Sequence, residues 1–224
     1  MLFVESRYLL FQKTEPMDEY KMLAHLYDPL LHLVMHRVRK KVTHIVKKLP
    51  HNSIVDICCG TGNQLKYLKR AGFIEATGVD ISRSMLNQAR KGKTHVACDE
   101  QDASKMHFKD NTFELGIISF ALHEKPEHIA REIISEAERI IHPRGHLIIV
   151  DYLFEGHVSL PARKTIHLVE RLAGKQHHQN FKRYLEYGGM DQLMKGYARK
   201  EEYRFHANAT GIRVYAMDKY GQYA

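Results

Sequence analysis

The chain has 224 residues, of which 44% are hydrophobic and 27% charged, and it contains no tryptophan. This length and composition predict one globular domain of a soluble protein. No apolar stretch approaches the roughly 18 residues of a membrane span, and the N-terminus lacks the pattern of a secretory signal. Three cysteines, two of them adjacent, do not make a disulfide framework, so a cytoplasmic location is expected.

The formal net charge is +8, and part of the excess lies in the sequence HRVRKKVTHIVKK at residues 36–48. Such a run can attract nucleic acid, an anionic membrane or an acidic substrate. Aliphatic residues recur through the run at helical spacing, which leaves the basic side chains on the outer face of a helix. We therefore expect a solvated helix here, within an N-terminal helical cap over residues 1–50.

From residue 53 to residue 154, apolar segments with strand character alternate with segments of helical periodicity. Near-continuous apolar strands that alternate with helices predict a parallel sheet covered on both faces. The expected strands of this region are 53–58, 75–81, 94–99, 113–122 and 146–152, and the expected helices are about 62–71, 82–89 and 126–141.

The rest of the chain breaks this alternation. A helical insertion is expected at about 156–195, followed by two strands at 201–207 and 211–218 joined by a turn. The predicted architecture is thus a single α/β domain over residues 51–224, with a parallel sheet finished by a hairpin.

The sequence VDICCGTG at residues 55–62 places a glycine-x-glycine turn behind the first strand, with Asp56 in front of it. A dinucleotide fingerprint needs a third glycine where Leu65 stands, and no phosphate-loop Lys-Ser or Lys-Thr follows. Asp56 would repel a pyrophosphate but attract an ammonium group. Asp80 ends the second strand, where a carboxylate can accept hydrogen bonds from both ribose hydroxyls. The pattern predicts a ligand with a ribose, an amino group and no phosphate, such as S-adenosylmethionine.

Five segments resemble, in order and spacing, the class I S-adenosylmethionine-dependent methyltransferases. They are VDICCGTG, GVDIS, DASKMHFKDNTFELG, ALHEKP and RIIHPRGHLIIVDY. The resemblance covers about residues 20–155 and is closest to the small-molecule branch that contains the ubiquinone/menaquinone C-methyltransferases. It implies a Rossmann-like, doubly wound sheet of seven strands, mostly parallel with an antiparallel last strand, and helices on both faces.

The resemblance also assigns contacts at the methionine end of the cofactor. Asp56, Gly60 and Gly62 match the motif residues there, and Cys59 is expected to line the same pocket. Tyr27 belongs to an aromatic segment that closes over the methionine, and its ring could stabilise the sulfonium by cation–π attraction.

At the adenosine end, the resemblance gives the ribose hydroxyls to Asp80 and packs Ile81 against the adenine. Asp102 would accept a hydrogen bond from the adenine amino group, and Ala103 would lie beside the ring. One departure is Cys58, which stands where many members of the family have the first glycine of the turn. Since adjacent cysteines cannot easily chelate one ion together, no metal site is expected.

His123 is the candidate general base. It follows the fourth expected strand, and a histidine there can remove a proton as a phenol or enol attacks the methyl group. The alternative is that His123 shapes the pocket or orders a loop, with Glu124 orienting it or facing solvent. Asp151 and Tyr152, at the end of the fifth expected strand, are weaker candidates. A dedicated base is optional, because methyl transfer depends mainly on alignment.

These residues predict a methyltransferase that acts on a small, hydrophobic or quinone-like acceptor. The alternatives are an RNA methyltransferase that uses the basic face and a cofactor-binding protein without turnover. The segment ALHEKP lacks the Asn/Asp-Pro-Pro-aromatic motif of many nucleic-acid methyltransferases, so nucleic acid is not the expected partner. Peripheral contact with a membrane stays open.

Overall fold

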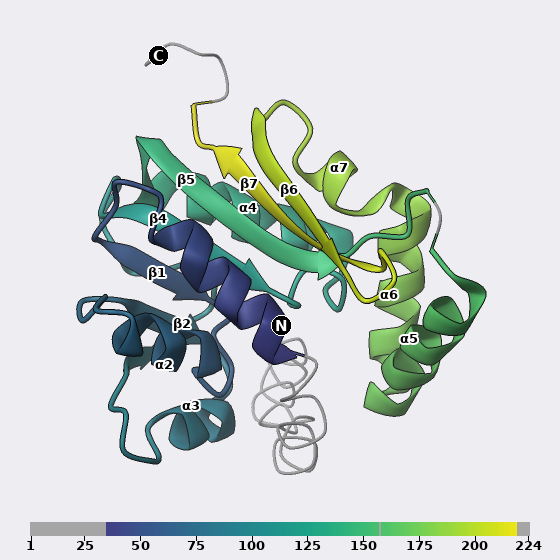
Figure 1. Ribbon diagram of the computed structural model, residues 1–224, viewed down its shortest axis with the longest axis horizontal. Helices are drawn as coiled ribbons and strands as arrows, with labels where there is room; N and C mark the ends of the chain where they lie inside the picture. The colour runs from purple at the N-terminus through teal and green to yellow at the C-terminus, as the bar shows by residue number, and fades with distance from the viewer. Residues whose placement is uncertain (1–34, 157, 219–224) are drawn as a thin grey trace, which may run out of the picture.

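Seven strands of mostly apolar residues form the sheet at the centre of the protein (Figure 1). The computed structural model describes residues 35–156 and 158–218. The sheet has the order β3-β2-β1-β4-β5-β7-β6. Its strands are β1 (Ile54–Ile57), β2 (Thr77–Asp80), β3 (Ala97–Glu100), β4 (Phe113–Ser119), β5 (Ile141–Tyr152), β6 (Arg199–Phe205) and β7 (Thr210–Ala216).

Pairing within the sheet is parallel from β3 through β5, and β7 runs antiparallel to both β5 and β6. This confirms the predicted mostly parallel sheet with an antiparallel last strand. Strand β1 lies between β2 and β4. The chain runs outward from β1 through β2 to β3 and then continues at β4, on the other side of β1. The carboxyl ends of parallel strands at such a switch point form a crevice in which ligands bind.

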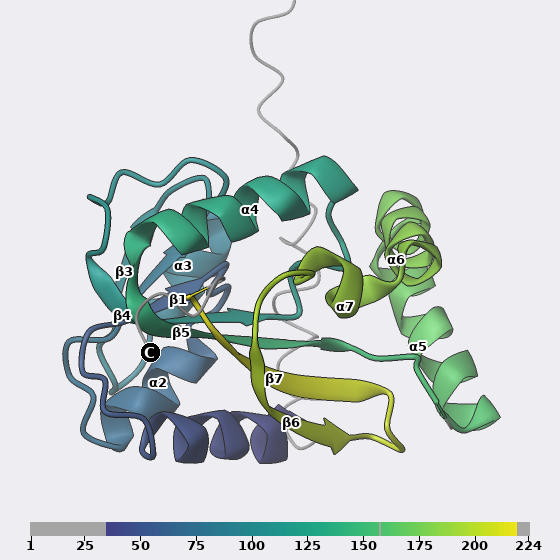
Figure 2. The same cartoon turned by 90° about the horizontal axis from the view of Figure 1, so that it is seen from above.

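Helices cover both faces of the sheet (Figure 2). One face carries the N-terminal helix, described over residues 35–46, with α2 (Asn63–Arg70) and α3 (Arg83–Ala89). The other face carries α4 (Glu127–Ile140), α6 (Lys175–Tyr187) and α7 (Gly189–Leu193). Because side chains alternate along a strand, Ile54 packs into the first core and Val55 into the second.

The N-terminal helix has the expected amphipathic character. Val38, Val42 and Ile45 are buried against the sheet, whereas Arg37 and His44 are exposed. No helix of the described residues is long and apolar enough to cross a membrane.

Strand boundaries differ from the expectation by one to five residues, and the differences are largest at three strands. Strand β5 begins at Ile141, directly after α4, because Ile141 already pairs with Phe113 before a bulge in the register. Strand β4 ends at Ser119 because Phe120 has a left-handed backbone with φ of 54°. Strand β3 begins at Ala97 rather than at residue 94.

Helices α5 (Leu160–Ala173), α6 and α7 fill most of the segment expected to be a helical insertion. Helix α5 begins where the hydroxyl of Ser159 accepts a hydrogen bond from the backbone N–H of Ala162, with Pro161 in the first turn. Helices α5 and α6 stand at one end of the sheet, beyond the carboxyl end of β5 (Figures 1 and 2).

The turn after β1 gives a stability prediction. Gly60 and Gly62 both have left-handed backbones, with φ of 53° and 64°. A Cβ added to Gly62 would lie 2.9 Å from the Cβ of Ala89, whereas a Cβ added to Gly60 would have no neighbour within 4 Å. Gly62→Ala should therefore lower the free energy of unfolding by about 1–3 kcal/mol more than Gly60→Ala does. Urea titration measures both values, and equal losses in the two variants would contradict the close contact.

Candidate active site

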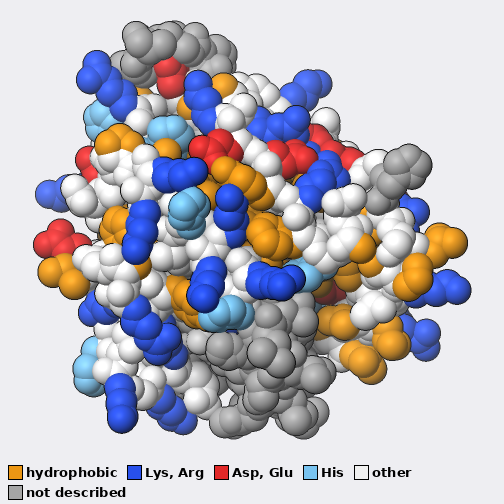
Figure 3. All heavy atoms as spheres, viewed as in Figure 1, with side chains coloured by type: hydrophobic (Ala, Val, Ile, Leu, Met, Phe, Trp, Pro, Cys, Tyr) orange, Lys and Arg blue, Asp and Glu red, His pale blue; other side chains and the backbone are white. Residues whose placement is uncertain are grey.

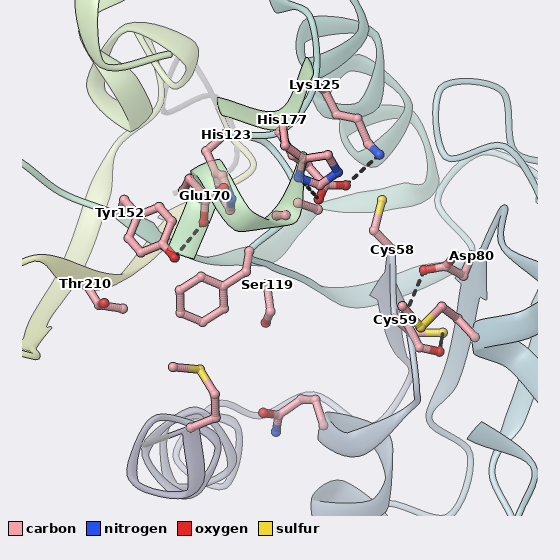
Figure 4. A pocket seen from close by; sticks show the side chains of 18 of the residues that line it. Cys58, Cys59, Asp80, Ser119, His123, Lys125, Tyr152, Glu170, His177 and Thr210 are labelled. Atoms are coloured by element: carbon pink, nitrogen blue, oxygen red, sulfur yellow. Dashed lines mark hydrogen bonds and ion pairs between the residues drawn. The ribbon is translucent and has the colours of Figure 1, made fainter. Parts of the chain in front are cut away.

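A cavity of about 960 Å³ lies at the carboxyl ends of β1, β2, β4 and β5. The N-terminal helix, α5 and the turn between β6 and β7 complete its walls. In Figure 4, Cys58, Cys59 and Asp80 lie on one side, and His123, Tyr152 and Glu170 on the opposite side. The cavity therefore has two chemically different halves, one beside the β1 turn and one beside the end of β5.

The turn after β1 brings the backbone close to the cavity. The N–H of Cys59 bonds the carbonyl of Val79 at 2.9 Å, and the N–H of Gly60 bonds the Asp80 carboxylate at 2.8 Å, so the turn is fixed to β2. Cys58 has a φ of 59°, a conformation that favours glycine. This explains why a glycine suits that position in the family.

Two carboxyl groups, the buried Asp56 and the half-buried Asp80, lie in the half of the cavity beside this turn. Asp56 is only 2% exposed, and burial together with the nearby Asp80 raises its pKa to about 8. Burial also raises the pKa of Asp80, although the backbone N–H groups of Ser82 and Gly60, each at 2.8 Å, oppose that shift. A ligand that brings positive charge to Asp56 would stabilise its ionised form.

Three further residues expected to contact the adenosine also line the cavity. Ile81 has 62% of its surface exposed, so an apolar surface is available beside Asp80. Ala103 is buried, and the exposed Asp102 uses one carboxylate oxygen to accept hydrogen bonds from the N–H and hydroxyl of Ser104. Tyr27 lies outside the described residues.

Cys58 and Cys59 both line the cavity as free thiols. The position of Cys58 in the turn leaves it partly exposed on the cavity wall. Burial raises the pKa of both thiols, so both stay protonated.

The other half of the cavity contains a chain of four bonded side chains. Nδ1 of His123 lies 2.6 Å from the carboxylate of Asp151, and Nε2 lies 3.5 Å from that of Glu170. The Tyr152 hydroxyl donates to the second Glu170 oxygen at 2.9 Å. The N–H groups of His123 and Tyr152 also donate to Asp151, so the three residues at the ends of β4 and β5 hold one another in place.

Charge in this chain centres on His123. Burial alone would lower the pKa of its imidazole, but Asp151 and Glu170 outweigh that effect and hold the pKa well above the ordinary value. Burial alone would raise the pKa of Glu170, but His123 outweighs burial and holds this pKa below its ordinary value. The arrangement therefore favours an imidazolium between two carboxylates, and His123 must lose a proton before it can act as a base.

Glu124 has two charged neighbours at the cavity wall. It forms an ion pair with Lys125 at 2.6 Å and lies 3.6 Å from His177. Burial alone would lower the pKa of Lys125, but the Glu124 carboxylate outweighs burial and leaves this pKa above its ordinary value. This pair places a second balanced charge on the cavity wall, close to the β1 turn.

Glu170 is the residue that sequence reasoning missed. It lies on the buried face of α5, next to the cavity-lining residues Ile166, Val169 and Ala173. An acidic residue on the apolar face of a helix is the signal that could have identified it, because a buried carboxylate needs a partner.

The sequence was also compared with known proteins. Residues 54–145 match the model of a family described as a methyltransferase domain. The ubiquinone/menaquinone biosynthesis C-methyltransferase UbiE of Roseobacter denitrificans is 34% identical over 106 residues, which are 44% of this chain and 42% of the relative. The demethylmenaquinone methyltransferase of Thermotoga maritima is 27% identical over 146 residues, 63% of each chain. The match thus spans less than two thirds of either relative.

Solved structures show the same fold at lower identity. A Thermotoga maritima protein described as a possible histamine N-methyltransferase has a TM-score of 0.63 and 20% identity, covering 89% of this chain and 98% of its own. Magnesium protoporphyrin IX methyltransferase from Synechocystis has a TM-score of 0.56 and 18% identity, covering 81% and 83%. Residues 54–145 thus match the model of a methyltransferase domain, and the chain around them shares the fold of these solved methyltransferase structures.

Proposed function

We propose that the protein transfers the methyl group of S-adenosylmethionine to a small, hydrophobic acceptor of the quinone type. The observation that carries the cofactor assignment is the pair of carboxyl groups at the ends of neighbouring parallel strands, the buried Asp56 and the partly exposed Asp80, both with raised pKa values. When bound, the cofactor supplies a methyl group on a positively charged sulfur.

The residues fit that cofactor by chemistry. Asp56 would receive the ammonium group, whose charge offsets the cost of ionising a buried carboxyl group. The oxygens of Asp80 each accept one backbone N–H and keep a lone pair that ribose hydroxyls can use. The exposed apolar surface of Ile81 would cover one face of the adenine.

The acceptor assignment rests on the opposite half of the cavity and on the relatives. The cavity-lining residues there include the rings of Phe120 and Tyr152 and the aliphatic side chains of Ile166 and Val169. The relatives named above act in quinone biosynthesis by their names. An apolar ring that carries a phenolic hydroxyl suits a site of this composition.

The reaction needs little chemistry from the protein. A carbon or oxygen of the acceptor forms a bond to the methyl carbon while the sulfur–methyl bond breaks, and the acceptor then loses a proton. The described residues would hold the two reactants in line and exclude water by means of α5. His123 could accept the proton once it has itself become neutral, with Asp151 fixing its ring.

Cofactor binding should release a proton at acidic pH. Burial and the nearby Asp80 raise the pKa of Asp56 to about 8, so binding of an ammonium group at acidic pH should displace the proton on its carboxyl group. Between pH 5.5 and 7, affinity should rise with pH by up to about tenfold per unit. Calorimetry in two buffers of different ionisation enthalpy measures both quantities.

Asp56→Asn tests the source of that proton, and Asp99→Asn is its control because Asp99 is exposed on β3. Asp56→Asn should bind more weakly and without proton release, whereas Asp99→Asn should behave as the unmodified protein does. Binding without proton release by the unmodified protein would contradict the role of Asp56. A protein that does not bind S-adenosylmethionine would overturn the proposed function.

The base role of His123 predicts a particular pH profile. Turnover should rise with pH through a value well above 6.5, because the imidazolium must first lose its proton. His123→Ala should lower turnover by about 10²–10⁴-fold while cofactor affinity is kept. Glu170→Gln should move the rising limb to lower pH, since it removes one of the carboxylates that raise the pKa of His123.

Initial rates of S-adenosylhomocysteine release across the pH range measure this effect. Glu132→Gln, an exposed residue of α4, is the matched control and should leave the limb in place. If the rising limb of the pH–rate profile lies at the same pH in Glu170→Gln as in the unmodified protein, a group other than His123 titrates. His123 would then act only by holding Asp151 and Glu170.

A further inference from the structure

Helix α5 has two different faces. Its inner face lines the cavity with Ala162, Thr165, Ile166, Val169, Glu170 and Ala173. Its outer face exposes three leucines, with 70% of Leu160, 57% of Leu168 and 72% of Leu172 accessible. Large apolar side chains that stand together on a surface mark a contact site.

Basic residues share the outer face with these leucines. At about 100° per residue, Lys164 and Arg171 fall within the same arc of the helix as Leu160, Leu168 and Leu172. Both are exposed, as is Lys175 at the start of α6. The only acid of α5, Glu170, lies on the inner face, so the outer face carries positive charge alone.

The position of the helix leaves this face accessible. Helix α5 stands at the edge of the molecule, away from the sheet (Figure 1). In the space-filling view, apolar side chains project beside Lys and Arg side chains at that edge (Figure 3). Leucines interleaved with basic residues are the composition of helices that lie in a membrane interface.

We infer that the outer face of α5 docks on an anionic lipid surface. The leucines would enter the boundary between head groups and acyl chains, and the basic residues would pair with lipid phosphates. Each Lys or Arg near such a surface contributes about 1 kcal/mol of attraction. The net charge of +8 acts in the same direction.

A second copy of the chain fits this face less well. Two outer faces placed together would bring basic residues against basic residues. A helix of 14 residues is about 21 Å long and about 10 Å wide, so its exposed face offers about 200 Å². A stable interface buries about 800 Å² on each partner.

Docking in this way would also serve the proposed function, on which this step of the inference rests. A quinone-type acceptor dissolves in lipid, and the inner face of α5 is a wall of the cavity. A helix that touches the membrane with one face and the cavity with the other places the site where such an acceptor is found.

Sedimentation of the full chain with vesicles tests the inference. Binding should be strong to vesicles of equal parts phosphatidylcholine and phosphatidylglycerol and weak to phosphatidylcholine alone. The double variant Leu168→Gln/Leu172→Gln should partition to the anionic vesicles at least about tenfold less, because it removes apolar surface that would be buried. Ile74→Gln is the control, since Ile74 is 71% exposed in the loop after α2 and should leave partitioning unchanged.

A second pair of variants tests the charge. Lys164→Glu/Arg171→Glu should lower binding to anionic vesicles at least about tenfold. Lys91→Glu/Lys93→Glu makes the same change in net charge on the exposed loop before β3 and should have a much smaller effect. Equal losses in the two double variants would overturn docking through α5, since only the overall charge would then matter.

Two results of the vesicle experiment would also overturn the inference: no binding to anionic vesicles, or equal binding to both vesicle types. A third such result would be light scattering in which the unmodified protein is a dimer and Leu168→Gln/Leu172→Gln is a monomer. Calorimetry with S-adenosylmethionine keeps this inference separate from the proposed function. If the protein binds the cofactor normally but does not bind vesicles, only the membrane-docking inference is wrong. Vesicle binding by a protein that does not bind the cofactor removes only the enzyme assignment.

Discussion

The parallel pairing of β1 with both β2 and β4 is the constraint on which the rest of the site depends. Together with the parallel pairing of β4 with β5, it brings the ends of four neighbouring strands to one edge, where the backbone turns away and leaves a cavity. Two carboxyl groups with raised pKa values lie there, the buried Asp56 and the half-buried Asp80, an arrangement that favours a cationic ligand. The remaining contacts add shape to a site whose charge preference is set by these two residues.

In the opposite half of the cavity, the buried carboxylate of Asp151 is balanced by neighbouring charges. Asp151 is fully buried at the end of β5, and a buried carboxylate needs a charged or hydrogen-bonded partner. His123 supplies one, and Glu170 then balances the imidazolium from α5. Because Glu170 comes from a helix outside the sheet, the same ion pairs that satisfy Asp151 also hold that helix against the cavity. The acceptor site and its covering helix are therefore coupled through charge.

Sequence reasoning reached the sheet and its order of elements because parallel strands leave strong patterns. The apolar runs of β1, β4 and β5 and the glycine turn at Gly60 and Gly62 depend on neighbours in the sequence. Glu170 could not be placed in the same way. Of its partners, His123 lies in the turn after β4 and Tyr152 at the end of β5, and only the fold brings the three together. The same limit applies to the protonation of His123, which depends on two carboxylates rather than on its own segment.

Four residues that are not glycine have left-handed backbones and line the cavity: Cys58, Phe120, His206 and Ala207. Such a conformation costs about 1–2 kcal/mol at each position, against a net stability of about 5–15 kcal/mol for a typical domain. A ligand that binds only the folded state adds about 2.7 kcal/mol at a hundred times its dissociation constant. By mass action, a filled cavity would offset part of the strain at its own rim. The thermal stability of the purified chain should accordingly understate its stability wherever the ligand is abundant.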